Sequence, residues 1–244
     1  MIKLGFKIGL AVLVLVSIGA CENRAERDTV EKTEVGELRE YDEIELSSVN
    51  DFRENSIKGP QYIDEDSVRL TIIGLVDSVR TYLYEDVVNR PSRKKVLTLN
   101  CVEGWSVTIL WEGVSLRDLI AEAGIDSAAK VIIFHAHDGY SSSFFLNYIL
   151  ENDIMMAYRM NDLTMPPERG FPFQLVAEGK WGYKWVKWIT EIELSADENY
   201  RGYWESFGYS NDGNLNKGFF EEEWPPSDSK EKDSASPGDK DKEN

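Results

Sequence analysis

The stretch Leu99-Asn100-Cys101-Val102-Glu103-Gly104-Trp105-Ser106 sets how the rest of the chain is interpreted. It follows a β-branched and apolar run, and we predict a strand ending near Cys101, a tight break at Gly104 and a second strand from Ser106. A thiol at a strand end can project into a cleft and bind a metal as a soft ligand. This pattern alone leaves open that Cys101 is a small core residue, as most free cysteines are.

The other of the two cysteines, Cys21, lies at the end of an export signal. Positive residues precede an apolar run at 8–16, and Ile18-Gly19-Ala20-Cys21 has the small-residue form of a lipoprotein signal. The apolar run is too short to span a bilayer comfortably, so we predict a cleaved signal peptide over 1–20 and lipidation of Cys21. An ordinary secretory signal is the alternative. Either one makes the folded part extracytoplasmic and leaves Cys101 without a disulfide partner.

Composition favours one main domain. The 244 residues are 42% hydrophobic and 11% aromatic, which is enough for one core of ordinary size. The formal net charge of -17 would repel phosphate backbones, so we expect no nucleic-acid partner and contact with a membrane only through the lipid. We predict an acidic flexible tether at 21–46, a globular domain at 47–224 and a disordered charged tail at 225–244.

Within the domain, strands and helices alternate without a repeat. Apolar alternation and glycine or proline breaks predict strands at 68–76, 96–102, 106–111, 130–134, 171–177 and 188–194. Helices are expected at 81–88 and 115–123, the latter capped by the Ser115 hydroxyl and ended by Gly124. The fold class is therefore α+β.

Two neighbouring segments combine glycines with basic and aromatic residues. They are Pro166-Pro167-Glu168-Arg169-Gly170-Phe171-Pro172-Phe173 and the run from Gly179 to Trp188, which holds three lysines. Backbone amides near glycines, together with lysines in an acidic protein, suit a phosphate or another anion. A solvated basic loop with tryptophan packing is the alternative.

Taken in order, four motifs give the chain a family likeness. They are Cys101–Ser106, Ala157–Asn161, Gly170–Pro172 and Gly182–Trp188. With these motifs the chain resembles the molybdopterin-binding domain of the sulfite oxidase family, in its short bacterial and archaeal form, over about 51–210. The resemblance implies an α+β fold of sulfite-oxidase type, with mixed sheets, short helices and long loops.

The resemblance also implies a molybdenum–molybdopterin cofactor and assigns residues to it. Cys101 matches the metal ligand and Tyr209 matches a tyrosine that faces the substrate, and these two are the expected catalytic residues. The expected cofactor-binding residues are Arg53, Asn55, His137, Asp138, Arg169, Gln174, Trp185, Val186 and Lys187.

One of these residues departs from the family pattern. Gln174 stands where the family usually has an arginine, and it carries no charge to pair with a phosphate. Arg169 is placed to compensate across the turn. The resemblance does not extend to a haem or C-terminal dimerisation domain, so it implies a separate redox partner, either a cytochrome or a quinone-linked protein.

Three functional hypotheses follow. The first is a membrane-anchored molybdoenzyme that transfers an oxygen atom, by sulfite-type oxidation or sulfoxide-type reduction, on a small oxyanion or an S-oxide or N-oxide. The second is a lipoprotein that keeps the fold but binds a ligand or protein without a cofactor. The third, a cysteine hydrolase, requires His135 or His137 as a base beside Cys101.

Overall fold

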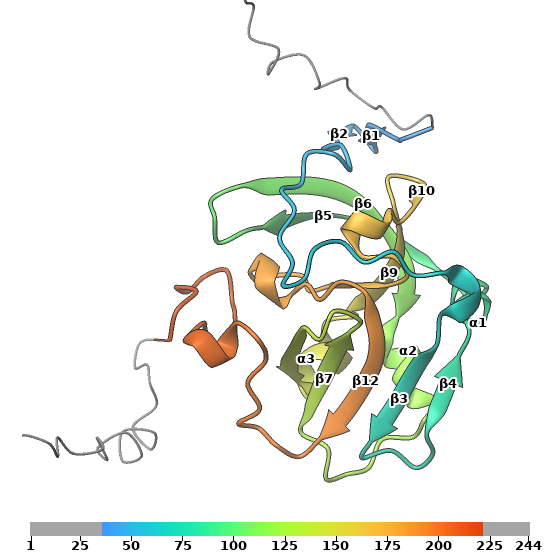
Figure 1. The fold of residues 1–244 in the computed structure, drawn as a ribbon, viewed down its shortest axis with the longest axis vertical. Coiled ribbons are helices and arrows are strands. Elements are labelled where there is room, and N and C mark those ends of the chain that lie inside the picture. Colours follow the sequence, from blue (N-terminus) through green and yellow to red (C-terminus); the bar gives the residue numbers. More distant parts are fainter. Residues whose placement is uncertain (1–35, 222–244) are drawn as a thin grey trace, which may run out of the picture. The chain divides into compact units, whose positions relative to one another are not determined.

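The computed structural model describes residues 36–221, which contain two five-stranded sheets (Figure 1). The predicted signal peptide, the lipidation site Cys21, the first part of the predicted tether and the predicted tail lie outside the described residues.

The first sheet contains the segment around Cys101. Its strands are β5 (Arg93–Asn100), β6 (Ser106–Ser115), β9 (Met155–Met160), β10 (Leu163–Thr164) and β11 (Gln174–Val176). The order is β10-β9-β6-β5, with β11 also paired to β9, and every pairing is antiparallel. The β5–β6 register runs from Arg93 opposite Gly113 to Asn100 opposite Ser106, which confirms the predicted strand–break–strand.

The second sheet is mixed. Its strands are β3 (Leu70–Gly74), β4 (Arg80–Tyr82), β7 (Val131–Ala136), β8 (Ser141–Phe145) and β12 (Ile189–Ser195). In the order β4-β3-β12-β7-β8, β12 pairs parallel with β3 and antiparallel with β7 (Figure 1). Strand β12, from the C-terminal part of the chain, therefore lies in the sheet between β3, from the N-terminal part, and β7.

The helices are short. They are α1 (Tyr84–Val88), α2 (Leu116–Ala121) and α3 (Leu146–Glu151), with 3-10 turns η1 (Glu65–Ser67), η2 (Pro167–Arg169), η3 (Gly182–Lys184) and η4 (Glu205–Phe207). The Ser115 hydroxyl accepts a hydrogen bond from the Asp118 amide and caps α2, as predicted. The helix predicted over 81–88 is wrong in its first part, because that part completes β4, which pairs with β3. The predicted strand over 171–177 is also shorter in the structure, since only β11 pairs within it.

Residues 36–46, assigned from sequence to the tether, include a small hairpin of β1 (Glu40–Tyr41) and β2 (Ile44–Glu45). The Glu37 carboxylate accepts hydrogen bonds from the Ser48 hydroxyl, the Val49 amide and the Asn161 side chain. Leu46 is buried. This part of the segment therefore packs on the domain, whose ordered chain begins before the predicted boundary at 47.

Both sheets contribute to one buried apolar cluster, which includes Ile109 and Trp111 from the first and Ile72, Phe134 and Ile192 from the second. Sheets with short helices and long connections are the α+β arrangement that was predicted. Within residues 36–221, no helix combines the length and apolarity needed to cross a membrane.

Candidate functional site

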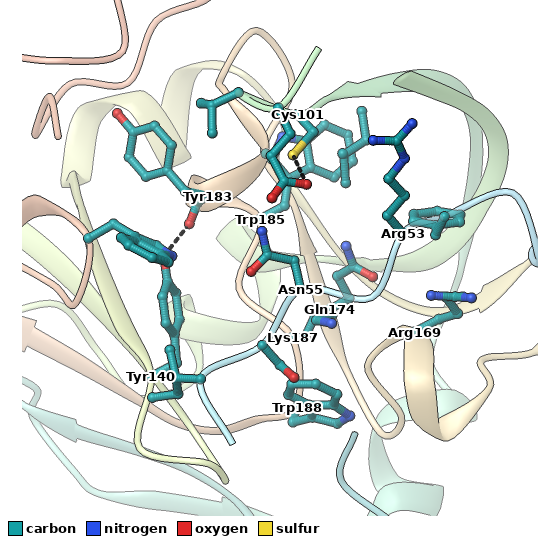
Figure 2. Close-up of a pocket in the computed structure, with 18 of the residues that line it drawn as sticks. Arg53, Asn55, Cys101, Tyr140, Arg169, Gln174, Tyr183, Trp185, Lys187 and Trp188 are labelled. Atoms are coloured by element: carbon teal, nitrogen blue, oxygen red, sulfur yellow. Dashed lines mark hydrogen bonds between the residues drawn. The ribbon is translucent and has the colours of Figure 1, made fainter. Parts of the chain in front are cut away.

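A cavity of about 240 Å³ opens where chain segments from both ends of the domain meet (Figure 2). Its walls come from residues 52–57, the β5–β6 turn, the turn around η2, the η3 segment and the loop after β12. Engineered cavities of about 150 Å³ already admit benzene. The space is therefore large enough for part of a small organic molecule.

Cys101 lies in the β5–β6 turn at one side of this cavity. Its amide donates to Trp105 O at 2.9 Å, the Gly104 amide donates back to Cys101 O at 3.1 Å, and Gly104 takes the positive φ of 84° that closes the turn. Cys101 is 8% exposed, and its Sγ lies 3.9 Å from a carboxylate oxygen of Glu103. Burial raises the pKa of Cys101, and the Glu103 charge adds to the shift. The free protein therefore holds a neutral thiol, which a bound metal would deprotonate.

Two cationic side chains, Lys187 and Arg169, lie lower than Cys101 in the view of Figure 2, whereas Arg53 lies nearer to the thiol. Lys187 Nζ lies 3.4 Å from each oxygen of Glu54, and Arg169 Nε donates to Val49 O at 2.7 Å. Arg169 also stacks over the Phe52 ring, with 5.1 Å from guanidinium carbon to ring centroid. Burial lowers the pKa of both Lys187 and Arg169, while the Glu54 carboxylate opposes both shifts.

Gln174 adds an unused polar group at this side. It is 2% exposed, lines the cavity, and its Oε1 has no hydrogen-bond partner. Gly170 packs closely against Lys187 and Gln174: a Cβ added to Gly170 would be 3.2 Å from Lys187 Cβ and 3.3 Å from Gln174 Cβ. A buried amide oxygen without a partner is rare and marks a place where a ligand can complete the bonding.

The third wall is aromatic. Tyr209 contacts the rings of Tyr183 and Trp204, with centroids 5.1 Å and 5.3 Å away, and all three line the cavity. The Tyr183 hydroxyl donates to Ser210 O at 2.6 Å, while its carbonyl accepts from the Tyr140 hydroxyl. These contacts hold the aromatic side chains around the space.

The cavity brings together most of the residues predicted for the site. Lining it are Arg53, Asn55, Cys101, Asp138, Arg169, Gln174, Trp185, Lys187 and Tyr209. It does not include His137, which is exposed and whose amide donates to Trp188 O, or Val186, which is buried in the apolar core. The cavity also has walls that the sequence analysis did not assign, from Phe52, Glu103, Trp105 and Glu168. Of these, Glu103 and Trp105 belong to the Cys101 motif, and their spacing was the available signal.

The prediction that three lysines form an anion cradle is wrong for two of them. Lys180 donates to Asp212 and Asn214, and Lys184 is fully buried against Glu205. Neither lines the cavity. Only Lys187 faces the space, because the other two side chains fasten loops elsewhere.

The hydrolase hypothesis lacks its base in this geometry. Neither histidine is among the lining residues, and His135 Nε2 lies 2.9 Å from a carboxylate oxygen of Glu193. In the described chain, no group of three or more histidine, cysteine, aspartate or glutamate side chains is placed to hold a metal. A metal at Cys101 would need further ligands from a cofactor.

A family model described as oxidoreductase molybdopterin binding domain matches residues 57–204. The chain belongs to this family. The match confirms the predicted family and its molybdenum–molybdopterin cofactor, and it identifies the chain as a member of an oxidoreductase family.

Curated relatives carry related names. The chain is 33% identical over 151 residues to the uncharacterized oxidoreductase YuiH of Bacillus subtilis, covering 62% of this chain and 76% of the relative. It is 30% identical over 148 residues to the putative protein-methionine-sulfoxide reductase subunit YedZ1 of Azospira oryzae, covering 61% and 56%. With the protein-methionine-sulfoxide reductase catalytic subunit MsrP of Campylobacter jejuni, the identity is 26% over 230 residues, covering 85% and 77%.

A solved structure shares the fold. The sulfane dehydrogenase SoxCD from Paracoccus pantotrophus superimposes with a TM-score of 0.55 at 24% identity, over 57% of this chain and 41% of that one. This likeness confirms the predicted fold class.

The side chains present fit the cofactor of this family. A soft sulfur donor, Cys101, lies at one side of the cavity, and Lys187, Arg169 and the unpartnered amide of Gln174 lie at the other. Such a donor set suits an elongated ligand with a metal at one end and an anionic group at the other.

Proposed function

We propose that the protein is an extracytoplasmic oxidoreductase that removes an oxygen atom from a sulfoxide. The balanced reaction joins the sulfoxide with two electrons and two protons to give a thioether and water. When bound, the molybdenum–molybdopterin group supplies the two-electron redox change. Oxidation of sulfite is the opposing direction within the same class.

The observation that carries the choice of direction is the charge around the thiol. Glu103 Oε2 lies 3.9 Å from Cys101 Sγ and also accepts from the Trp105 indole at 3.1 Å. A carboxylate at this place repels an anion such as sulfite more than it repels a neutral sulfoxide, while the Arg53 charge, which lowers the pKa of Cys101, offsets part of this repulsion. Two of the relatives named above are called protein-methionine-sulfoxide reductase subunits, which supports the same direction.

The residues of the cavity divide into two tasks. Cys101 would hold the metal, while Lys187, Arg169, Gln174, Arg53 and Asn55 would hold the pterin and its phosphate.

The substrate side belongs to Tyr209. Its hydroxyl has no hydrogen bond among the described residues, and it lines the cavity. It is placed to donate to the oxygen of a sulfoxide and so to orient the substrate.

The proposal extends to location and partner. The lipoprotein form of the signal supports a location outside the cytoplasm with a lipid on Cys21. A redox protein of cytochrome or quinone-linked type would supply the electrons, because the residues that line the cavity include no second redox group.

Metal analysis with activity assays tests the proposal. The protein made in cells with active molybdopterin synthesis should contain molybdenum near one per chain and oxidise a reduced viologen dye when methionine sulfoxide is added. Cys101→Ser should lose more than about 100-fold in activity, since even residues that only support metal ligands account for up to that factor.

Cys21→Ser is the matched control, because it removes the other thiol and should release the protein from the membrane while keeping its molybdenum. A preparation that oxidises sulfite and leaves sulfoxides untouched would overturn the proposed direction. A folded protein without molybdenum or pterin from the same cells would favour the binding lipoprotein instead.

A further inference from the structure

A fully buried ion pair lies directly behind the aromatic wall of the cavity. Lys184 Nζ donates to Glu205 Oε1 at 2.7 Å, to Ser143 O at 2.7 Å and to Asn211 O at 2.9 Å, and both charged side chains are 0% exposed. The Ser142 hydroxyl donates to the same Glu205 oxygen. We call Lys184 and Glu205 the rear pair.

The rear pair joins two chain segments, and in each segment residues that line the cavity come before and after the charged residue. Lys184 stands between Tyr183 and Trp185 in and after η3, and both of these neighbours line the cavity. Glu205 opens η4 directly after Trp204. The next cavity residue, Tyr209, follows the η4 turn.

The segment that carries Tyr209 has few bonds to the rest of the domain near the cavity, because the backbone amides of residues 206–210 donate only within 202–221 in the described chain. Examples are Tyr209 N to Trp204 O at 3.2 Å and Ser210 N to Phe219 O at 2.9 Å. The segment is held there by the Tyr183 hydroxyl bond to Ser210 O and by ring contacts, of which that between Tyr183 and Tyr209 spans 5.1 Å. Apart from Trp204, the other rings that contact Tyr209 are Phe219 and Phe220, with centroids 6.0 Å and 4.9 Å away, and Phe220 is 56% exposed. Aromatic contacts that face water constrain a loop less than three charge-assisted hydrogen bonds made without solvent.

We propose that the rear pair is a positioning pair that holds Trp204 and Tyr209 against the cavity and thereby sets how the substrate binds. The inference rests on the proposed function for its kinetic part only. Lys184 and Glu205 touch neither the cavity nor the reacting atoms, so they act through the wall that they fasten.

A second buried lysine in the same run supplies the matched control. Lys180 is 5% exposed and donates to Asp212 O, Asp212 Oδ1 and Asn214 Oδ1 at 2.6 to 2.9 Å. It fastens residues 212–214, which do not line the cavity. Loss of Lys180 therefore removes a comparable network without releasing the aromatic wall.

The first test uses the cofactor-free full chain with Cys21→Ser, in which Cys101 is the only thiol. Lys184→Met should raise the rate of Cys101 alkylation by iodoacetamide, because a displaced wall exposes the cavity. Lys180→Met should leave that rate within about twofold of the parent, although both variants lose stability in urea titrations. Equal rates in the parent and the folded Lys184→Met protein would overturn the proposal, whatever the reaction proves to be.

The second test uses the loaded enzyme. Lys184→Met should raise KM for methionine sulfoxide and lower kcat/KM by about 10- to 100-fold, with molybdenum content unchanged, since small misplacements of positioning groups have effects of that size. An unchanged KM would overturn the kinetic part even where alkylation speeds up. Absence of sulfoxide turnover in the parent would instead count against the proposed function alone.

The fully buried carboxylate can prevent Lys184→Met from folding, and a second variant meets that case. Lys184→Met/Glu205→Gln has no unpaired charge, so it should fold while still lacking the three donated hydrogen bonds. This double variant is then expected to show the same faster alkylation and higher KM. Parent-like values for both quantities would overturn the proposal.

Discussion

Lys184 and Lys187 are three residues apart, and burial lowers the pKa of both, but Lys184 stabilises the fold while Lys187 faces the cavity. Lys184 donates to three acceptors at 2.7 to 2.9 Å, whereas Lys187 Nζ makes two long contacts of 3.4 Å with the Glu54 carboxylate and lies over the Trp188 ring. Burial therefore does not distinguish a structural lysine from a ligand-binding one. The two are distinguished by whether the ammonium group has its hydrogen bonds completed by the protein.

The largest expected difference between the two lysines is in stability. Lys184→Met should lower the free energy of unfolding by about 3–5 kcal/mol, because it leaves the Glu205 carboxylate buried without its cation. Lys187→Met should lower it by about 1 kcal/mol or less, since its pairing with Glu54 is long and partly exposed. Urea titrations of the cofactor-free proteins measure both values. Similar losses for the two variants would remove the distinction.

For cofactor binding we expect the larger effect from the Lys187 variant and the smaller one from the Lys184 variant. Lys187→Met should weaken binding of the cofactor by about 10- to 100-fold, in line with the 1.5–3 kcal/mol of a hydrogen bond to a charged group. Pterin content after dialysis against a series of buffers gives the comparison. Lys180→Met is its control, because that ammonium is satisfied by Asp212 and Asn214 outside the cavity. Full pterin retention by Lys187→Met would show that Lys187 is structural too.

How far the sequence predicted these features depends on how local their causes are. The β5–β6 hairpin follows from alternation and Gly104 alone; its turn is predicted, whereas the predicted strands 96–102 and 106–111 stop short of the outer ends at Arg93 and Ser115. The strands β8 and β9 and the helix α3 are not among the predicted elements, and β8 is an edge strand whose partner in the sheet is β7. The three lysines look alike in sequence, and only distant partners such as Glu205 and Asp212 distinguish them.

The motifs that revealed the family are also not all parts of the site. Asn161 ends one of them, yet its side chain accepts from the Leu110 amide at 3.1 Å and donates to Ser47 O at 2.8 Å. It fastens the N-terminal segment to the first sheet instead of lining the cavity. A family motif therefore predicts a fold and a cofactor more securely than the role of each residue in it.

A smaller effect is expected from completing the charge pattern beside Lys187. Gln174→Arg places a guanidinium where Gln174 Oε1 now lacks a partner, and it supplies the arginine that the family resemblance leads one to expect. Affinity of the cofactor-free protein for inorganic phosphate should rise by about three- to tenfold, because repulsion from Lys187 offsets part of the gain. Isothermal titration with phosphate measures it, and Gln174→Leu should show no gain. A fall in affinity for the arginine variant would show that Arg169 already supplies the charge required.

The finest distinction concerns pH. Burial lowers the pKa of Lys187, so its ammonium loses the proton at a lower pH than an exposed lysine does. Binding of an anion requires the protonated form; the affinity for sulfate, whose own charge stays constant, should therefore decline as pH rises through that lowered pKa. Lys187→Arg stays charged throughout and should hold its affinity over the same range. Because the two proteins should differ by only a few-fold at neutral pH and diverge above it, parallel curves for both would place the anion away from this side chain.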